Sequence, residues 1–284
     1  MQNKKKISII TPCMNAEKYI YETLMSVINN RAVTQESVDL EYIVCDGQSS
    51  DGTLKIIENI FSKNYSNNIS LHLFSEKDSG LYDALCKGLK HASGDICAYI
   101  NAGDLYAPSA FEIVSELFFN NSVQWLTGIS TIYNEHGHSV SFQVPLKYRS
   151  SLIQQGFYGR MLPFIQQEST FWCNSLNKTL DFDRLKKFKY AGDYYLWKQF
   201  STIAQLHIVE AWISGFRRHS GQLSDIHLND YYEEMTSISD QRKIKDSFQA
   251  FVDKLFWLFL PDRFKKGFNP KAFYRYNHEM QQYI

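Results

Sequence analysis

The sequence predicts an α/β fold with a mostly parallel sheet flanked by helices, and three observations support this. Short apolar runs at Ile7–Ile10, Leu40–Cys45 and Ile96–Ile100 are typical of strands covered on both faces, as in a parallel sheet. Segments with helical spacing of apolar residues alternate with these runs. Each run also stops abruptly at short polar residues, and in open α/β sheets ligands bind beyond the carboxyl ends of the strands.

Apolar spacing places a helix after each of the first strands, and the chain contains no repeat or low-complexity linker. A short strand is expected at Leu71–Leu73. The expected helices are Ile20–Ile28, Thr53–Phe61, Leu81 to about Gly94, and Pro108 to about Phe119.

The pattern changes beyond about residue 122. Trp125–Tyr133 and Ser139–Val144, joined across Glu135–Gly137, predict a hairpin of two strands. Further on, Gly192-Asp193 precedes an expected helix over Tyr194–Phe200.

Composition excludes several classes of protein. With 284 residues and 44% hydrophobic content, the chain can bury a full core as one large domain or as a domain with an extension. Its 30 basic residues balance 30 acidic ones, so overall charge gives no support to nucleic-acid binding. The five cysteines are widely spaced and form no CxxC, which favours small buried thiols in a reducing cytosol over metal or disulfide chemistry.

The sequence also predicts the compartment. The amino-terminal Met-Gln-Asn-Lys-Lys-Lys enters the first strand without an apolar signal segment. No apolar run approaches the roughly 18 residues that a membrane span requires. We therefore expect a cytosolic protein, or one that is peripheral to the inner face of the cell membrane.

Several common site motifs are absent from the sequence. The first strand is followed by no GxGxxG, and the chain has no GxxxxGK[ST], which makes a dinucleotide site or a P-loop improbable. HExxH and GxSxG are also missing, so a zinc protease or an α/β-hydrolase is not indicated.

Polar residues follow three of the expected strands, at Thr11–Asn15, Asp46–Gly52 and Asn101–Asp104. Because the carboxyl ends of parallel strands meet at one edge of the sheet, these residues predict a single site. Short polar and acidic side chains there suit a polar, anionic ligand together with a cation.

Further blocks extend this pattern in a fixed order to about residue 224. They are Ile7–Asn15, Asp46–Thr53, Glu76–Ala84 with Lys87-Gly88, Gly94-Asp95, Asn101–Asp104, Gln167–Phe171, Ala191–Tyr194, and Gly215–His219 with Gly221-Gln222 and Ser224. This ordered set resembles the family 2 glycosyltransferases of the GT-A fold, inverting enzymes that build bacterial surface polysaccharides. The resemblance implies a Rossmann-like, mostly parallel sheet with a C-terminal helical extension.

The resemblance implies a nucleotide-sugar site. Asp46 would accept hydrogen bonds from an N–H donor of the base, such as uracil, although an Asx turn or helix cap also explains Asp46 and Asp51. Lys87, one turn after Asp83, could pair with that carboxylate or with a phosphate. The residues assigned to this site are Thr11, Pro12, Asn15, Asp46, Ser49, Asp51, Asp83, Lys87, Asn101, Ala102, Gly103 and, near the diphosphate, Arg217.

The resemblance also implies a divalent cation, Mn²⁺ or Mg²⁺, bound by Asp104 and by His219, for which a surface histidine is the alternative. Relatives often have Asp-x-Asp-Asp where this chain has Asn101, Ala102 and Gly103 before a lone Asp104. This departure concerns the ribose contacts and the tightness of metal binding.

Asp193 is the candidate general base, with an N-cap of the following helix as the alternative. Gln167, Glu168 and Thr170 are assigned to the donor sugar and the acceptor. These assignments predict a hexosyl- or N-acetylhexosaminyltransferase that uses a nucleotide-diphosphate sugar, with a UDP-sugar favoured, and a glycan or polyprenyl-diphosphate-linked acceptor. Two alternatives stay open: a sugar-phosphate nucleotidyltransferase, and a catalytically inactive subunit of a polysaccharide assembly complex.

We expect residues 1–225 to form the catalytic domain, with a donor half to about 120 and an acceptor half after it. Residues 226–284 form an aromatic and basic extension. In it, apolar residues from Phe248 to Phe259 line one side of a helix that Pro261 ends, with basic residues following. This pattern suits a peripheral membrane contact through residues 247–275, packing against the catalytic domain, or a homodimer interface.

Overall fold

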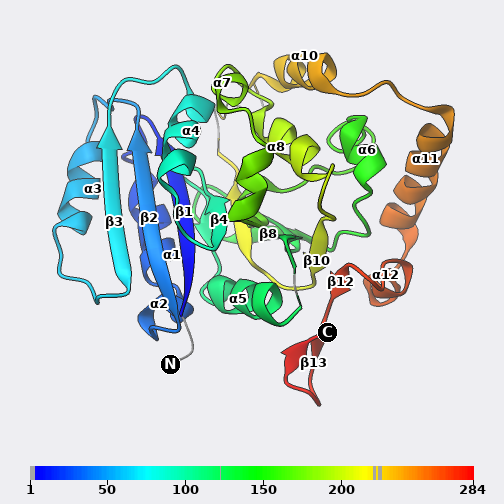
Figure 1. The fold of residues 1–284 in the computed structure, drawn as a ribbon, viewed down its shortest axis with the longest axis horizontal. Helices are drawn as coiled ribbons and strands as arrows, with labels where there is room; N and C mark the ends of the chain where they lie inside the picture. Colours follow the sequence, from blue (N-terminus) through cyan, green and yellow to red (C-terminus); the bar gives the residue numbers. More distant parts are fainter. Residues whose placement is uncertain (1–3, 122, 220–221, 223–225) are drawn as a thin grey trace.

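A computed structural model describes residues 4–121, 123–219, 222 and 226–284. At its centre is an eight-stranded sheet in the order β12-β10-β6-β9-β4-β1-β2-β3 (Figure 1). The four strands at one end are parallel to one another, as predicted. They are β1 (Lys5–Cys13), β2 (Val38–Asp46), β3 (Ile69–Ser75) and β4 (Ile96–Tyr99).

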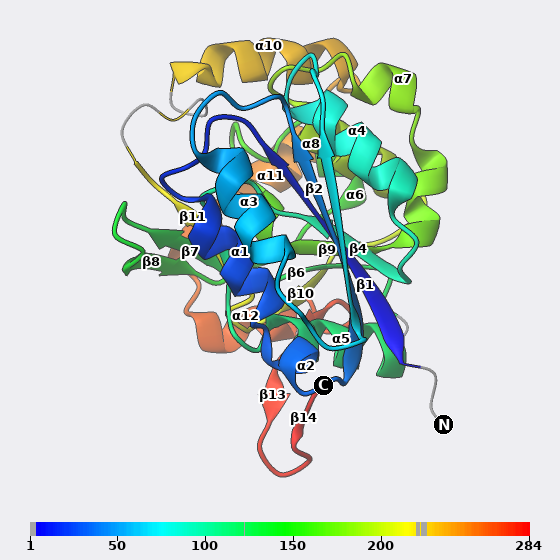
Figure 2. The same ribbon diagram turned by 90° about the vertical axis from the view of Figure 1, so that its left-hand side faces the viewer.

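Helices cover both faces of this half of the sheet. Figure 2 shows α1 and α3 on one face and α4 on the other. Gly88 lets α4 approach β1, because a Cβ there would lie 2.4 Å from Cγ2 of Ile10. Four helices confirm the expected order: α1 (Ile20–Ile28), α3 (Thr53–Phe61), α4 (Leu81–His91) and α5 (Ala110–Asn120). The short helix α2 (Arg31–Thr34) was not predicted.

The other half of the sheet is built from short strands: β6 (Trp125–Thr127), β9 (Thr170–Cys173), β10 (His207–Val209) and β12 (Phe273–Tyr274). Only β9 among these is antiparallel to its neighbours, β4 and β6, so the sheet is mostly parallel. The adjoining helical elements are α6 (Ser150–Gln154), η1 (Gln167–Ser169), η2 (Asn174–Thr179), α7 (Phe182–Leu185) and α8 (Gly192–Phe200).

A second, four-stranded sheet has the order β5-β11-β7-β8, with β5 (Leu105–Tyr106), β7 (Ser130–Tyr133), β8 (Ser139–Gln143) and β11 (Ser214–Arg217). The hairpin of β7 and β8 was predicted. The single strand expected over Trp125–Tyr133 is wrong, because the chain passes there from β6 of one sheet to β7 of the other. Gly128 marks the crossing, since a Cβ there would lie 2.5 Å from the Ile213 side chain.

The C-terminal segment contains α10 (Leu228–Ile238), α11 (Ile244–Phe259) and α12 (Asp262–Phe268), and a hairpin of β13 (Tyr276–Asn277) and β14 (Gln282–Tyr283). Figure 1 shows α11 at the end of the molecule opposite β3 and α3. Strand β12 joins the central sheet beside β10. Within the described residues, none of the helices has the length and apolar character needed to cross a membrane.

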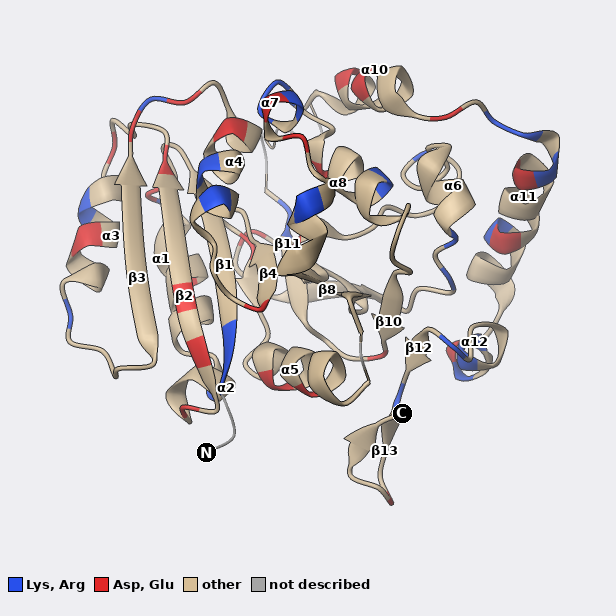
Figure 3. Ribbon diagram, viewed as in Figure 1, with Lys and Arg blue, Asp and Glu red and all other residues tan. Residues whose placement is uncertain are grey.

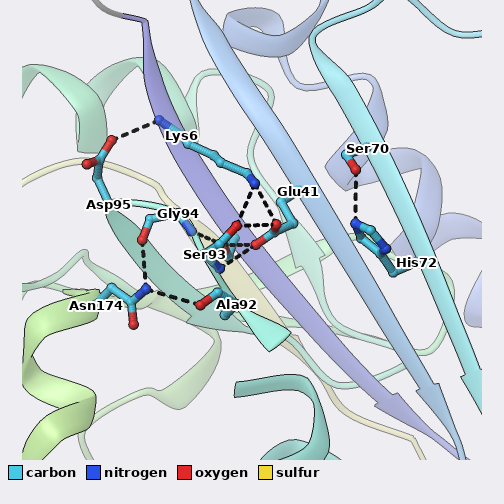
Figure 4. A network of polar contacts seen from close by, with 10 residues as sticks. Lys6, Glu41, Ser70, His72, Ala92, Ser93, Gly94, Asp95 and Asn174 are labelled. Atoms are coloured by element: carbon cyan, nitrogen blue, oxygen red, sulfur yellow. Dashed lines mark hydrogen bonds and ion pairs between the residues drawn. The ribbon is translucent and has the colours of Figure 1, made fainter. Parts of the chain in front are cut away.

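A network of hydrogen bonds around Glu41 lies near the amino-terminal ends of the central strands (Figure 4). The Glu41 carboxylate accepts hydrogen bonds from the Lys6 ammonium at 2.6 Å, the Ser8 hydroxyl at 2.5 Å and the Ser93 backbone N–H at 2.7 Å. Burial opposes ionisation of Glu41, but these donors outweigh it and lower its pKa to about 2.

All five cysteines are free, and all but the half-buried Cys173 are buried, in agreement with the predicted role as small thiols.

Candidate active site

The loops that follow β1 and β2 are cross-linked at the carboxyl edge of the sheet. Asn15 adopts a left-handed conformation with φ of 49°, and its N–H donates to the Ser49 hydroxyl at 2.8 Å. The Glu17 N–H donates to Asp51, which also accepts from the Thr53 N–H at the start of α3 at 3.0 Å. The structure therefore brings Asn15, Ser49 and Asp51 together, and Asp51 braces the loop as the helix-cap alternative proposed.

Asp46 is the last residue of β2 and is buried. Its carboxylate accepts from the Ser49 N–H at 3.1 Å and from the Ser75 hydroxyl at the end of β3 at 2.7 Å. Asp78 approaches the same turn, because a Cβ on Gly47 would lie 2.6 Å from Oδ2 of Asp78. Two carboxylates thus lie beside Gly47. Asp78 was not assigned to the site from the sequence, although it lies within the Glu76–Ala84 block.

Asp83 and Lys87 do not pair with each other, so that interpretation of their helical spacing is wrong. Asp83 accepts from the N–H and hydroxyl of Ser79, at 3.0 and 3.1 Å, and so holds the turn that precedes α4. The Lys87 ammonium lies 3.2 Å from the Glu76 carboxylate and donates to the Lys77 carbonyl at 3.1 Å. These partner residues all belong to the loop before α4. The spacing of residues along the helix therefore could not predict them.

Three residues assigned to ligand binding have side chains in the core. The Thr11 hydroxyl forms a hydrogen bond with the Tyr42 hydroxyl at 3.0 Å, and Pro12 is buried beside it in β1. The Thr170 hydroxyl donates to the Gln166 carbonyl at 2.7 Å and is fully buried. In this structure these side chains support the site and do not line its surface.

The segment after β4 forms a tight turn. Gly103 has φ of +125°, which favours glycine, and its N–H donates to the Thr23 hydroxyl at 2.9 Å. Asn101 lies beside Ala102 in this turn. Its side-chain amide donates a hydrogen bond to the side-chain oxygen of Gln167 at 3.0 Å. The side-chain oxygen of Asn101 is buried without a hydrogen-bond partner among the described residues, which leaves an acceptor at the end of β4.

Asp104 is buried and accepts a hydrogen bond from the backbone N–H of Arg217 at 2.9 Å. Burial raises the pKa of Asp104 to about 7, although the Arg217 N–H and charge partly offset the effect. The Arg217 guanidinium pairs with Glu22 of α1 and lies 4.9 Å from the centroid of the Tyr19 ring. This pairing turns it toward α1, so contact with a diphosphate would require it to leave Glu22.

The His219 imidazole stacks on the Tyr19 ring with centroids 5.1 Å apart. Gly221 and Ser224, quoted from the same block, lie outside the described residues. Within the ranges that the structure describes, His, Cys, Asp and Glu form no group of three that could hold a metal ion. A cation held by Asp104 alone among the carboxylates fits Mg²⁺ or Mn²⁺, which often take few protein carboxylates and complete their shell with phosphate and water.

Asp193 lies in the first turn of α8, so the expected helix begins earlier than predicted and Ala191 occupies its N-cap position. Its carboxylate accepts from the Tyr194 N–H at 2.7 Å and from the hydroxyls of Tyr82 and Tyr231, both at 3.5 Å. Burial raises the pKa of Asp193 to about 6, with these donors opposing the shift. Glycine is required at 192, because a Cβ there would lie 2.4 Å from the Tyr82 ring.

The charges of both Asp104 and Asp193 act on a third carboxyl group, that of Glu168. It lies in η1, is 3% exposed, and its Oε1 has no hydrogen-bond partner in the described part of the chain. Burial and the charges of Asp104 and Asp193 raise its pKa well above the usual range. The charges of Asp104 and Asp193 thus both act on Glu168, although the three residues come from distant segments of the chain, and we call these three carboxyl groups the acidic trio.

The sequence and fold define a class of enzyme. The model of glycosyl transferase family 2 matches residues 8–176, more than half of the chain. The protein belongs to glycosyl transferase family 2 and is a transferase, which confirms the resemblance deduced from the motifs.

Two relatives are similar in sequence to parts of this chain that differ in length. An Escherichia coli glucosyltransferase, "UDP-Glc:alpha-D-GlcNAc-diphosphoundecaprenol beta-1,3-glucosyltransferase WfgD", is 28% identical over 67% of this chain and 68% of its own length. Chondroitin synthase of E. coli is 29% identical over 39% of this chain, which spans only 15% of that enzyme.

Solved structures share the fold. S. aureus TarS (residues 1–349), crystallised with UDP-GlcNAc, matches 94% of this chain and 79% of that chain with a TM-score of 0.64 and 17% identity. A mannosyltransferase from Pyrobaculum calidifontis, solved with GDP-Man and Mn²⁺, matches 95% of this chain and 74% of that chain with a TM-score of 0.57 and 15% identity. These likenesses confirm the predicted GT-A fold.

Proposed function

We propose that the protein is a metal-dependent, inverting glycosyltransferase of surface polysaccharide synthesis. It moves a sugar from a nucleotide-diphosphate sugar, with a UDP-sugar favoured, to a hydroxyl of a glycan or lipid-linked glycan. The observation that carries the proposal is the acidic trio, three buried carboxyl groups with raised pKa values, of which Glu168 is influenced by the charges of both Asp104 and Asp193. Perturbed groups of this kind cluster at functional sites.

The turn at Gly47 supports the donor assignment. Asp46 and Asp78 present carboxylate oxygens, which accept hydrogen bonds and so match a base with an N–H, as uracil has. The names of similar proteins point the same way, since WfgD uses UDP-Glc and TarS was crystallised with UDP-GlcNAc. Asn15 and Ser49 hold the neighbouring loops together and would keep this turn in place for the nucleotide.

Asp104 is the residue that we assign to the cation, and the unpartnered side-chain oxygen of Asn101 is the nearest further acceptor along the chain. When bound, Mn²⁺ or Mg²⁺ would neutralise charge on the donor diphosphate. Binding would require Asp104 to be ionised, and with a pKa of about 7 it is only partly ionised at neutral pH without the cation. His219 stays a candidate further ligand.

Asp193 is assigned as the general base. In a single displacement the acceptor hydroxyl attacks the anomeric carbon as the bond to the diphosphate breaks, and one carboxylate takes the hydroxyl proton. A pKa of about 6 leaves Asp193 ionised at neutral pH and close to the optimum for proton transfer. Tyr82 and Tyr231 fix its oxygens. Gln167 and Glu168 lie on the segment between Asp104 and Asp193, where sugar and acceptor would meet.

We further propose residues 1–225 as the catalytic domain, with its donor and acceptor halves, and residues 226–284 as the extension. Tyr231 of α10 contacts Asp193, so the extension would also contribute to the base. An inactive assembly subunit is disfavoured because Asp104 and Asp193 are both retained. A nucleotidyltransferase would carry a Gly-rich basic loop after β1, which the Thr11–Asn15 segment is not.

Thermal unfolding tests this proposal. We expect UDP or a UDP-sugar to raise the melting temperature in the presence of Mn²⁺ and much less in its absence, and release of nucleoside diphosphate to require a glycan acceptor. Comparing the change in melting temperature across a set of nucleotide sugars identifies the base and the sugar that the protein binds. Full transfer activity in excess chelator would contradict the metal dependence, while absence of any nucleotide response would contradict the proposed donor class.

A further inference from the structure

Helix α11 packs on the protein through one side, whose buried residues are Ala250, Asp253 and Trp257. The Arg149 guanidinium forms two hydrogen bonds with Asp253, at 2.7 and 3.1 Å, and this aspartate is buried. Ala250 and Trp257 flank it on the buried side, with the Trp257 ring 5.6 Å from the ring of Tyr148. These contacts fix the rotation of the helix about its axis.

The opposite side of α11 is apolar and exposed, and we call it the α11 apolar face. Phe248 and Phe259 are 70% and 77% exposed, although both are large hydrophobic residues. Spacings of three and four residues place the members of this face in one row along the helix. The face consists of Ile244, Phe248, Phe251, Leu255, Leu258 and Phe259. Of the three alternatives for this helix, packing of the apolar row against the catalytic domain is therefore wrong, since the helix packs through Ala250, Asp253 and Trp257 instead.

Positive charge surrounds the α11 apolar face. Figure 3 shows basic residues before α11, along it and on α12. Two acidic residues of this region are paired with cations, Asp253 with Arg149 and Asp262 with Lys265 at 2.8 Å. Asp246 accepts a hydrogen bond from the neutral Gln155 at 2.7 Å and keeps its charge. The exposed cationic side chains of this region outnumber this carboxylate, and they are Lys243, Lys245, Lys254, Arg263 and Lys271.

We propose that α11 and α12 lie on an anionic lipid surface, with the α11 apolar face inserted at the boundary between headgroups and acyl chains. An exposed apolar row with a cationic border is the arrangement by which interfacial helices bind such surfaces. A second copy of this chain is a poorer occupant, because two copies packed through this face would bring together two borders in which positive charge predominates.

Flotation of the full-length protein with vesicles tests this directly. We expect it to float with vesicles of phosphatidylcholine and phosphatidylglycerol at about 0.05 M salt. Flotation should fall several-fold at about 0.5 M salt or with phosphatidylcholine alone, since screening weakens contacts between exposed charges. A double variant, Phe248→Ser with Phe259→Ser, should lose flotation and keep the melting temperature of the wild type. Replacing Lys245 and Lys254 by Gln should weaken flotation chiefly at low salt.

The matched control is Phe142→Ser with Ile203→Ser, which removes two apolar side chains of 59% and 60% exposure from other surfaces. This control should float like the wild type. The proposal is overturned if the wild type ignores anionic vesicles, or if both double variants float equally well. It is also overturned if light scattering shows a wild-type dimer that Phe248→Ser with Phe259→Ser makes monomeric and flotation is absent, because the α11 apolar face is then a dimer interface.

Discussion

Buried carboxyl groups lie at both ends of the central strands, and they differ in how their oxygens are satisfied. Glu41, toward the amino-terminal ends, is 4% exposed, accepts several hydrogen bonds, and has its pKa lowered to about 2. Asp104, at the carboxyl edge, is also 4% exposed, accepts one hydrogen bond from a backbone N–H, and has its pKa raised to about 7. Glu168 beside it keeps an oxygen with no partner in the described residues.

The comparison shows that carboxyl groups of equal exposure can have opposite pKa shifts. The donors around Glu41, including the charged Lys6, outweigh its desolvation, whereas at Asp104 deeper burial outweighs the Arg217 N–H and charge. Glu41, with its pKa lowered, contributes stability that is present above the unfolded-state pKa near 4.5 and is lost as pH falls toward 2. Glu168, with its pKa raised, contributes stability that is present below the unfolded-state pKa and is lost as pH rises through its folded-state pKa. The hydrogen bonds around Glu41 stabilise the fold. The carboxyl groups of the acidic trio, whose pKa values are raised, would instead be able to bind ligands and exchange protons.

The largest effect is expected from Asp193→Asn. Asparagine keeps the size of the side chain but cannot take the proton of the acceptor, so transfer should fall by roughly 10²–10⁴-fold. Nucleotide-induced thermal stabilisation should stay at the wild-type value. Asp183→Asn, on an exposed carboxylate of α7, is the control and should transfer normally. Near wild-type turnover in Asp193→Asn would transfer the role of base to Glu168.

Glu41→Gln should destabilise the protein by roughly 2 kcal/mol at neutral pH, the usual contribution of hydrogen bonds to a charged group. Urea unfolding measures this difference, which should shrink as pH falls from about 4.5 toward 2 because the wild-type carboxylate is then protonated. A difference that persists unchanged at low pH would show that packing, and not the ionised network, accounts for it.

Asp104→Asn should weaken Mn²⁺-dependent nucleotide binding by at least about tenfold, or 1.4 kcal/mol. The amide oxygen can still accept the Arg217 N–H, so the fold should be kept. Asp95→Asn, immediately before β4, is the matched control at the other end of this strand. If both variants bind nucleotide equally well with Mn²⁺, the cation assignment to Asp104 fails.

The smallest effect is expected from Glu168→Gln. A neutral side chain of the same shape removes the cost that the raised pKa of Glu168 adds to folding as pH rises above the unfolded-state pKa, so stability at about pH 8 should rise by about 1 kcal/mol. Near pH 4 the variant and the wild type should unfold alike, since Glu168 is then protonated in both states. Glu41→Gln and Glu168→Gln thus shift stability in opposite directions, and equal signs for both would contradict the comparison.

Sequence reasoning located the carboxyl edge because the rule for strand ends depends only on local patterns. It placed Asp46, Asn101 and Asp104 at the ends of the correct strands, and the motif order gave the family. Short strands such as β5 and β12 carry too few residues to show a pattern. The split of Trp125–Tyr133 was missed because both halves are apolar, and only Gly128 marks the change of sheet.

The partners of the site residues were harder to predict because they come from distant parts of the chain. Tyr82 and Tyr231 reach Asp193 from α4 and α10, and the Glu41 network joins residues of β1, β2 and the α4–β4 loop. Composition and spacing contain no information about such contacts. The exposed side of α11 was likewise undetermined until the Arg149–Asp253 contact fixed its rotation.

The pH dependence of transfer at saturating donor and Mn²⁺ tests the central claim most directly, because a bound cation keeps Asp104 ionised and leaves Asp193 to titrate. We predict that the wild-type rate rises with pH through an apparent pKa near 6 and then levels. The residual rate of Asp193→Asn should lack this rise. A wild-type rate that is flat between about pH 5 and 8, or the same rise in Asp193→Asn, would contradict the assignment of Asp193 as the base.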